Sequence, residues 1–276
     1  MRCINFDKEF ERYVGAWMKE HAKEYRNYDE MEAAMPDVYA QFLDTPVNWL
    51  AGARPGEYFG QFDNAHQLVN WMEDYFKQRI PVPDMLLNRI AELGLEAEES
   101  LMTLLKKERS TQEIRMAAIT LLREIDSAAP MEYYIGLQAV RREGEDELAD
   151  NALDSLSSMG EKAVPAMRAA LPLASQDGQE ALLTVLSDYP GDEQVLQTAL
   201  SLLKNRRDRA AILAGCLGKL GDERALPALI ALAASEETPY LDYIELRSAI
   251  ERLGGEAPER VFDAVDPAYE ALRDKQ

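Results

Sequence analysis

The sequence predicts an all-α protein built as a solenoid, in which helical pairs stack along the chain. A turn signal recurs at steps of about 30 to 33 residues. Apolar residues with helical spacing lie between the turns, and strict alternation with hairpin turns is absent. A repeat of this length indicates helical pairs that bury their apolar faces against neighbouring pairs. The turn positions are Gly94, Asp126 with Ser127, Gly160, Gly191, Gly221 and Gly254.

Residues 1–83 are expected to form an aromatic-rich helical cap at the start of the solenoid. All three tryptophans, Trp17, Trp49 and Trp71, lie in this region. A terminal repeat exposes an apolar face that needs covering, which is the structural role of such a cap. Helices are predicted over residues 7–27, 29–43 and 63–79.

An irregular stretch of the cap, residues 45–63, is the first candidate site. It mixes glycines and prolines with aromatic residues, and irregular stretches of this length are often functional. As a recognition element, Trp49, Tyr58 and Phe59 would supply rigid apolar contact area and Arg54 a forked donor. As a plug, the same aromatic residues would fold onto the open end of the first repeat. Both interpretations stay open.

Residues 84–276 are expected to form about five to six helical pairs. Their helices carry apolar residues at i, i+3, i+4 and i+7, a spacing that places an apolar stripe on one face. Stripes of second helices fall within residues 114–121, 149–156, 182–189 and 246–253. Stripes of first helices fall within residues 196–203 and 226–233.

Turn chemistry agrees with this periodicity in the segment LGDERALPAL. Gly221 can adopt the left-handed conformation that ends a helix, and Asp222 can accept from the free amides of the next one. Pro227 falls near the start of that helix, where its missing N–H costs little. The segment therefore predicts a helix end followed closely by a helix start.

Two stretches resemble the HEAT-like repeat of the phycobilisome-lyase type. In RAAILAGCLGKLGDERALPALIALAAS, residues 209–235, an Ala-rich second helix runs into Leu-Gly-Asp, and Ala-x-Pro-x-Leu opens the next helix. SMGEKAVPAMRAAL, residues 158–171, is similar. The resemblance covers about residues 84–276 and implies a right-handed superhelix with a curved binding surface. It does not imply lyase activity, because many non-enzymes share this repeat.

The concave face of such a superhelix, lined by the second helices, is the second candidate site. Polar positions off the apolar stripes would form a mixed-charge surface there. A partner protein or peptide could bind it, with charge setting the register and aromatic residues supplying affinity; the alternative is a merely solvated face. The positions predicted to contribute are Arg115, Arg206, Arg207 and Tyr243, with Glu113, Glu147, Asp150, Gln179 and Asp242 beside them.

Charge argues against nucleic acid and membranes as partners. The chain of 276 residues carries 50 acidic and 30 basic side chains, a formal net charge of -20. Binding to phosphates depends on Lys and Arg, and the dense basic run here, over residues 204–209, is short and interrupted by Asp208. A DNA glycosylase-like mode of binding is therefore the least favoured of the functions considered.

Metal, cofactor and catalytic signatures are lacking in the sequence. The two cysteines, Cys3 and Cys216, have no CxxC spacing, and the two histidines, His21 and His66, belong to no ligand motif. The opening MRCINFDKEF is charged where a signal peptide is apolar, and no apolar run is long enough to span a membrane. We expect a cytoplasmic protein without metal or cofactor.

The function predicted from these features is that of a non-enzymatic scaffold. It would bind an unidentified protein or peptide on the concave face of the solenoid, with residues 45–63 contributing at one end. The alternative is a bilin-lyase-like or other small-molecule-handling enzyme, a class implied by the resemblance alone.

Overall fold

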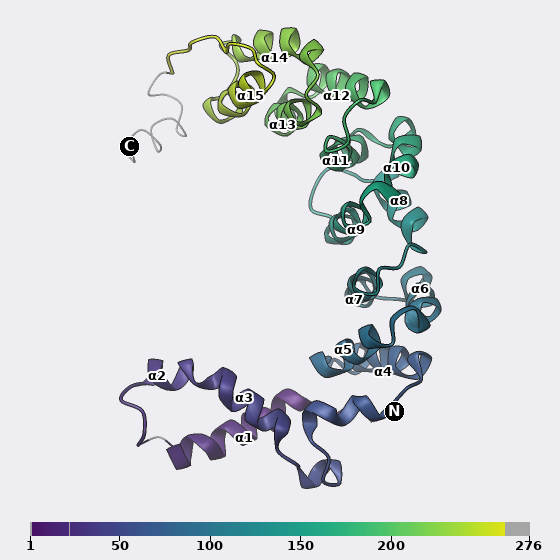
Figure 1. The fold of residues 1–276 in the computed structure, drawn as a ribbon, viewed down its shortest axis with the longest axis vertical. Coiled ribbons are helices and arrows are strands. Elements are labelled where there is room, and N and C mark those ends of the chain that lie inside the picture. The colour runs from purple at the N-terminus through teal and green to yellow at the C-terminus, as the bar shows by residue number, and fades with distance from the viewer. Residues whose placement is uncertain (1, 22, 263–276) are drawn as a thin grey trace. The chain divides into compact units, whose positions relative to one another are not determined.

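The computed structural model describes residues 2–21 and 23–262, and within them the chain forms helices and no strand (Figure 1). The predicted all-α class is confirmed. The chain divides into two compact units, residues 1–130 and residues from 131 onward. The predicted boundary near residue 83 falls inside the first unit, which therefore contains both the predicted cap and the start of the predicted repeats.

The first unit begins with α1 (Phe6–His21), α2 (Tyr28–Ala33) and α3 (Met35–Asp44), followed by the 3-10 turns η1 (Asn48–Leu50) and η2 (Pro55–Gln61). It continues with α4 (Ala65–Gln78), α5 (Asp84–Glu92), η3 (Gly94–Ala97), α6 (Glu98–Lys106) and α7 (Gln112–Glu124).

The early helices are shorter than predicted, for reasons that the local sequence supplies. The predicted helix over 7–27 ends at His21, and Asn27 caps a new helix by accepting from the amide of Glu30 at 2.8 Å. The predicted helix over 29–43 is interrupted at Ala34. Pro36 lies in the first turn of α3, where its ring and its missing N–H are tolerated. Inside a continuous helix its ring would clash with the preceding turn and a backbone hydrogen bond would be lost.

A buried carboxylate stabilises the first unit in a pH-dependent way. Glu73 on α4 accepts from Lys107 at 2.5 Å and from Lys77 at 3.0 Å. Burial raises the pKa of Glu73, but the hydrogen bonds from the two lysines outweigh it and leave the pKa below its usual range. A lowered pKa in the folded state means that the stabilisation is present above about pH 4.3 and is lost as the pH falls further.

We therefore expect the Glu73→Gln variant to lose less stability than the wild type when the pH is lowered. Urea unfolding at neutral pH and near pH 3, followed by tryptophan fluorescence, checks this, because all three tryptophans belong to the first unit. The variant should be less stable than the wild type at neutral pH by about 1 kcal/mol, and the difference should shrink in acid. A difference that is constant with pH would contradict the assignment.

The second unit contains α8 (Met131–Ala139), α9 (Glu147–Ser158), η4 (Gly160–Lys162), α10 (Val164–Ala170), η5 (Leu171–Leu173) and α11 (Gln176–Leu186). It continues with α12 (Glu193–Asn205), η6 (Arg207–Arg209), α13 (Ala210–Leu220), η7 (Glu223–Ala225), α14 (Leu226–Ala233) and α15 (Tyr240–Arg252).

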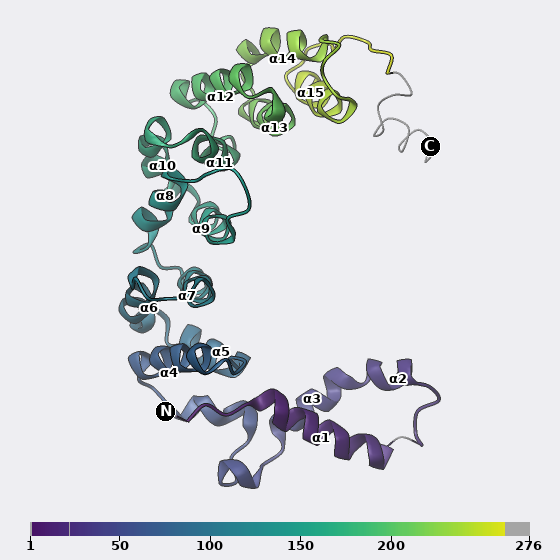
Figure 2. The ribbon, with the colours of Figure 1, turned by 180° about the vertical axis from the view of Figure 1, so that it is seen from behind.

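The helices of the second unit lie in two layers, as both views of the ribbon show (Figures 1 and 2). One layer holds α9, α11, α13 and α15, and the other holds α8, α10, α12 and α14. Each helix of one layer packs on its sequence neighbour in the other, as α12 does on α13 and α14 on α15. Within the first layer, α13 and α15 pack closely, because Gly218 on α13 has no side chain. The Cα of Ala249 on α15 lies only 3.1 Å from the point that a Cβ of residue 218 would occupy.

The six predicted turns all contain a backbone in the left-handed region. Gly94, Gly160, Gly191, Gly221 and Gly254 have φ between 59° and 92°, and Asp126 has φ 52°. At Gly221 this conformation follows α13 directly, as the turn chemistry predicts. The repeated turn signal therefore marks real helix ends.

Residues after α15 return across the last helical pair, which the sequence did not predict. The Tyr243 hydroxyl donates to the Pro258 carbonyl at 2.9 Å, and Arg260 donates to the Thr238 carbonyl at 2.9 Å. The guanidinium carbon of Arg260 also lies 4.4 Å from the centre of the Phe262 ring. These contacts hold Pro258 and Arg260 against α15 and the loop before it.

Cys216 on α13 is expected to be almost inert in the native protein. Burial raises the pKa of its thiol to about 11, so at pH 8 only about one molecule in a thousand carries the reactive thiolate. Burial raises the pKa of Cys3 as well, but this thiol is only half-buried. Alkylation with iodoacetamide, followed by peptide mass spectrometry, should modify Cys3 much faster than Cys216. Similar rates at both would show that α13 opens readily.

Candidate functional site

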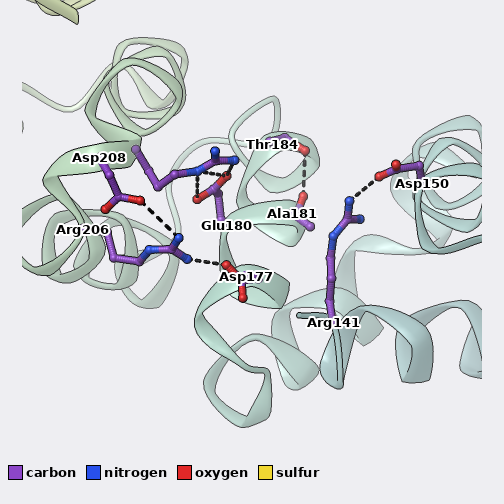
Figure 3. Close-up of polar contacts among 9 residues, drawn as sticks. Arg141, Asp150, Asp177, Glu180, Ala181, Thr184, Arg206 and Asp208 are labelled. Atoms are coloured by element: carbon purple, nitrogen blue, oxygen red, sulfur yellow. Dashed lines mark hydrogen bonds and ion pairs between the residues drawn. The ribbon is translucent and has the colours of Figure 1, made fainter. Parts of the chain in front are cut away.

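A charged groove in the second unit is the candidate site (Figure 3). It has a volume of about 520 Å³ and is lined by α9, α11, the loop between α8 and α9, and residues just before α13. Its charged lining residues come from all of these segments: Arg141, Arg142, Glu143, Glu145, Asp150, Asp177, Glu180, Arg206 and Arg209. Among these residues, acids and arginines are nearly balanced.

The strongest ion pair of the groove joins Glu180 and Arg209. The Arg209 Nε lies 3.0 and 2.9 Å from the two carboxylate oxygens, and its Nη2 also bonds the carboxylate, so two nitrogens hold one acid. The Glu180 side chain is 10% exposed and that of Arg209 is 41% exposed. The carboxylate raises the pKa of Arg209 above its usual value. This pair forms a fixed wall of the groove.

Two further arginines are held by carboxylates at the groove (Figure 3). Arg206 donates to Asp177 and, at 3.4 Å, to Asp208. The bond to Asp177 raises the pKa of Arg206. Arg141 donates to Asp150. The side chains of Asp150 and Asp208 are exposed, so these acids can exchange their partner for another cation.

The start of α11 is fixed on the end of α8. Ser175 caps α11 by accepting from the Gly178 amide at 3.1 Å, and its hydroxyl donates to the Arg141 carbonyl at 2.6 Å. Gly178 leaves no room for a side chain, because a Cβ would lie 2.0 Å from the Gln138 carbonyl oxygen. Buried Gln138 donates to the Ala149 carbonyl at 2.7 Å and so ties α8 to α9 as well. These contacts set where the groove acids of α11 lie.

One face of α11 lines the groove. The residues concerned are spaced at i, i+3, i+4 and i+7 and therefore share that face: Asp177, Glu180, Ala181 and Thr184. Ile212 on α13 adds an apolar side chain that is 39% exposed, and Leu153 on α9 adds a half-buried one. The groove thus combines charges with apolar area.

The predicted concave-face residues separate in the structure. Arg206 lines the charged groove, whereas the adjacent Arg207 lies on another surface and pairs with Glu237 at 3.0 Å. Tyr243 is buried in the last helical pair, which differs from the predicted position on an open face. Arg115 lies in the first unit, where it donates to the Lys107 carbonyl at 3.1 Å.

In the predicted loop site, the aromatic residues pack inside the cap region. Phe59 is 1% exposed, and its ring centre lies 5.1 Å from that of Trp71. Tyr58 is half-buried, and its ring centre lies 6.1 Å from that of Phe6. Trp49 is exposed, although its ring contacts Phe6 at 5.8 Å. Arg54 is also exposed and pairs with a neighbouring glutamate. Trp49 and Arg54 are therefore the members of this set open to a partner, and their binding role stays a prediction.

Sequence reasoning placed Asp150 on the predicted binding face but missed Asp177 and Glu180, the groove acids of α11, although a signal for these two exists. Asp177 and Arg206 are 29 residues apart, and so are Glu180 and Arg209. This separation is close to the predicted repeat length: both acids lie on α11, and both arginines lie just before α13. A search for opposite charges one repeat apart could have found both pairs.

The histidines are used locally. The His21 ring stacks on Trp17 with ring centres 4.8 Å apart, and His66 shares a 3.0 Å hydrogen bond with Ser100. Over residues 2–21 and 23–262, no group of three or more histidine, cysteine or acidic side chains is placed to hold a metal ion. In the same part of the chain, none of the helices has the length and apolar character needed to cross a membrane.

Comparisons with known proteins add no family. No protein-family model matches the chain, and no curated protein matches it either. The class that the fold and the groove define is therefore an all-α protein with a charged groove formed mainly by one helical layer of its second unit.

Proposed function

We propose that the chain is a HEAT-like repeat solenoid that acts as a non-enzymatic scaffold and binds a segment of a partner protein in the charged groove. Three features support the repeat architecture: left-handed turns at repeat spacing, helices in two layers within the second unit, and ion pairs one repeat apart. The resemblance of residues 158–171 and 209–235 to HEAT-like repeats supports it as well.

The observation that carries the binding proposal is the combination of rigid and exchangeable ion pairs in the groove. The Glu180 carboxylate is largely withdrawn from water, and its pair with the partly exposed Arg209 keeps the groove in shape. Asp150 is exposed and can release Arg141 to a carboxylate of a partner, while offering its own charge to a lysine or arginine of that partner. A partner segment that carries both charges therefore fits best, with Ile212 as an apolar anchor.

Duplex DNA is a poorer partner for this surface. In the basic run over 204–209, Arg206, Arg207 and Arg209 are each paired with a carboxylate. Binding to phosphates would have to displace these acids within a chain of net charge -20. The small-molecule alternative rests on the resemblance alone and has no feature of the groove in its favour.

A pair of matched substitutions tests the groove. Ile212→Asp places a charge at the apolar anchor, and Ile244→Asp makes the same change on α15, outside the groove, at a residue that is also 39% exposed. Affinity capture from lysate should retain a partner with the wild type and with Ile244→Asp. We expect Ile212→Asp to weaken retention about tenfold or more without unfolding.

Equal retention by both variants, or no retention by the wild type, would contradict binding in the groove. Circular dichroism melting of both variants establishes that each one is folded, so loss of binding is not loss of structure.

A further inference from the structure

An exposed apolar helix lies outside the charged groove. Residues 225–234, ALPALIALAA, contain no charged or hydrogen-bonding side chain, in a chain of which 29% is charged. They include all of α14, and Pro227, Ala228 and Ala231 on this helix are exposed. Exposed apolar surface of this kind marks an interaction site when it is contiguous and bordered by polar residues.

The apolar side chains line a groove between α14 and α12. Its volume is about 450 Å³. The groove opens here because α12 and α14 do not pack closely, whereas α13 and α15 in the other layer do. Leu200 and Leu203 on α12 face Pro227, Ala228, Ala231 and Leu232 across it. The small side chains of α14 leave space in which another helix could lie.

The charged side chains that line this groove are all cations. They are Lys204, Arg207 and Arg224. Lys204 is exposed and has no ion pair among the described residues. Arg207 pairs with Glu237, and Arg224 pairs with Glu193 and, through two nitrogens, with Asp222; all three acids lie outside the lining. The pairs with Glu237 and Glu193 join exposed side chains and exchange easily, whereas Asp222 is 31% exposed and holds Arg224 more firmly.

We propose that this groove, formed by α12 and α14, binds an acidic amphipathic helix of a partner protein. Apolar residues of that helix at i, i+3, i+4 and i+7 would fill the groove, and its carboxylates would reach the cations on the rim. Charge complementarity favours this partner: the net charge of the chain is -20, whereas the charged side chains that line this groove are all cations, and Lys204 among them has no ion pair in the described part of the chain. The surface is separate from the charged groove, so it does not depend on the function proposed above.

Fluorescence anisotropy with a defined probe tests the proposal. The probe is a labelled synthetic helix of about 18 residues, with Leu on one face and Glu on the other, long enough to be partly helical alone. It should bind the full chain, and its affinity should fall several-fold as salt is raised, because the charges lie in exposed positions. The same helix with Lys in place of Glu should not bind.

Matched variants locate the site of binding. Ala231→Glu places an acid in the floor of the groove, and its control, Ala169→Glu, makes the same change at an exposed alanine of α10. Lys204→Glu reverses a rim charge in the last turn of α12, and Lys106→Glu does so in the last turn of α6. We expect Ala231→Glu to weaken binding about tenfold and Lys204→Glu several-fold, with both controls within about twofold of the wild type.

Other occupants would be recognised by different results, each of which overturns the proposal. A second copy of the chain is indicated if sedimentation shows self-association that Ala231→Glu abolishes while the probe does not bind. An anionic lipid surface is indicated if the chain co-floats with phosphatidylglycerol vesicles but does not bind the probe. The proposal is also contradicted if the Glu and Lys helices bind equally well, or if Ala169→Glu weakens probe binding as much as Ala231→Glu does.

Discussion

Gly178→Ala should destabilise the second unit by about 3 kcal/mol. The new methyl group would lie 2.0 Å from the Gln138 carbonyl oxygen and 3.0 Å from its carbonyl carbon. These are backbone atoms, so relief requires moving α11 away from α8 and disturbing the Ser175 cap between them. Urea titration followed by the accessibility of Cys216 to alkylation measures this, because Cys216 is buried in the same unit.

Gly215→Ala is the matched control for this prediction. Gly215 lies in α13, and a Cβ there would meet no atom within 4 Å. Alanine is preferred over glycine in a helix, so this variant should be more stable by about 1 kcal/mol. A loss of stability in both variants, or in neither, would show that the close approach of α11 to α8 is not the cause.

Glu180→Gln should cost about 1 to 2 kcal/mol of stability. The substitution leaves Arg209 without its carboxylate at a site where the acid is largely buried. This expected loss of stability is smaller than that for a fully buried ion pair, because the guanidinium of Arg209 is partly exposed to water. Urea titration with Cys216 accessibility checks it, and Glu180→Gln combined with Arg209→Gln should lose less than the sum of the two single changes.

The control for the ion pair is Glu237→Gln, which removes the acid that pairs with Arg207. Both side chains of that pair are exposed, so the expected change in stability is within about 0.5 kcal/mol. If Glu237→Gln were as damaging as Glu180→Gln, burial of the Glu180 carboxylate would not be the source of the effect.

The sequence predicted the helix ends better than the surfaces. The predicted turns depend on local chemistry, namely a residue that can take positive φ, which is glycine at five of the six turns and Asp126 at the other. After Gly191 and Gly221, an acid also caps the next helix or 3-10 turn. The break at Ala34 was missed, although Pro36 signalled it. Local signals therefore determine most element boundaries in this chain.

The charged groove could be predicted only in part, because it depends on how neighbouring helices register. Arg206 was identified, but its partner Asp177 and the pair of Glu180 and Arg209 were not. Arg206 and Arg207 are adjacent in sequence yet line different grooves, since α12 ends at Asn205 and a 3-10 turn begins at Arg207. Tyr243 was misplaced because the segment that covers it, around Pro258, gives no periodic signal.

The most direct test of the scaffold proposal is site-specific photo-crosslinking from the charged groove. A photoreactive amino acid at position 212 should form one discrete adduct with a partner in lysate, and mapping should place the adduct on a segment that carries both acidic and basic residues. The same group at position 244, equally exposed on α15, should form little of that adduct. The proposal is contradicted if position 212 yields no adduct, or if both positions yield the same one in equal amount.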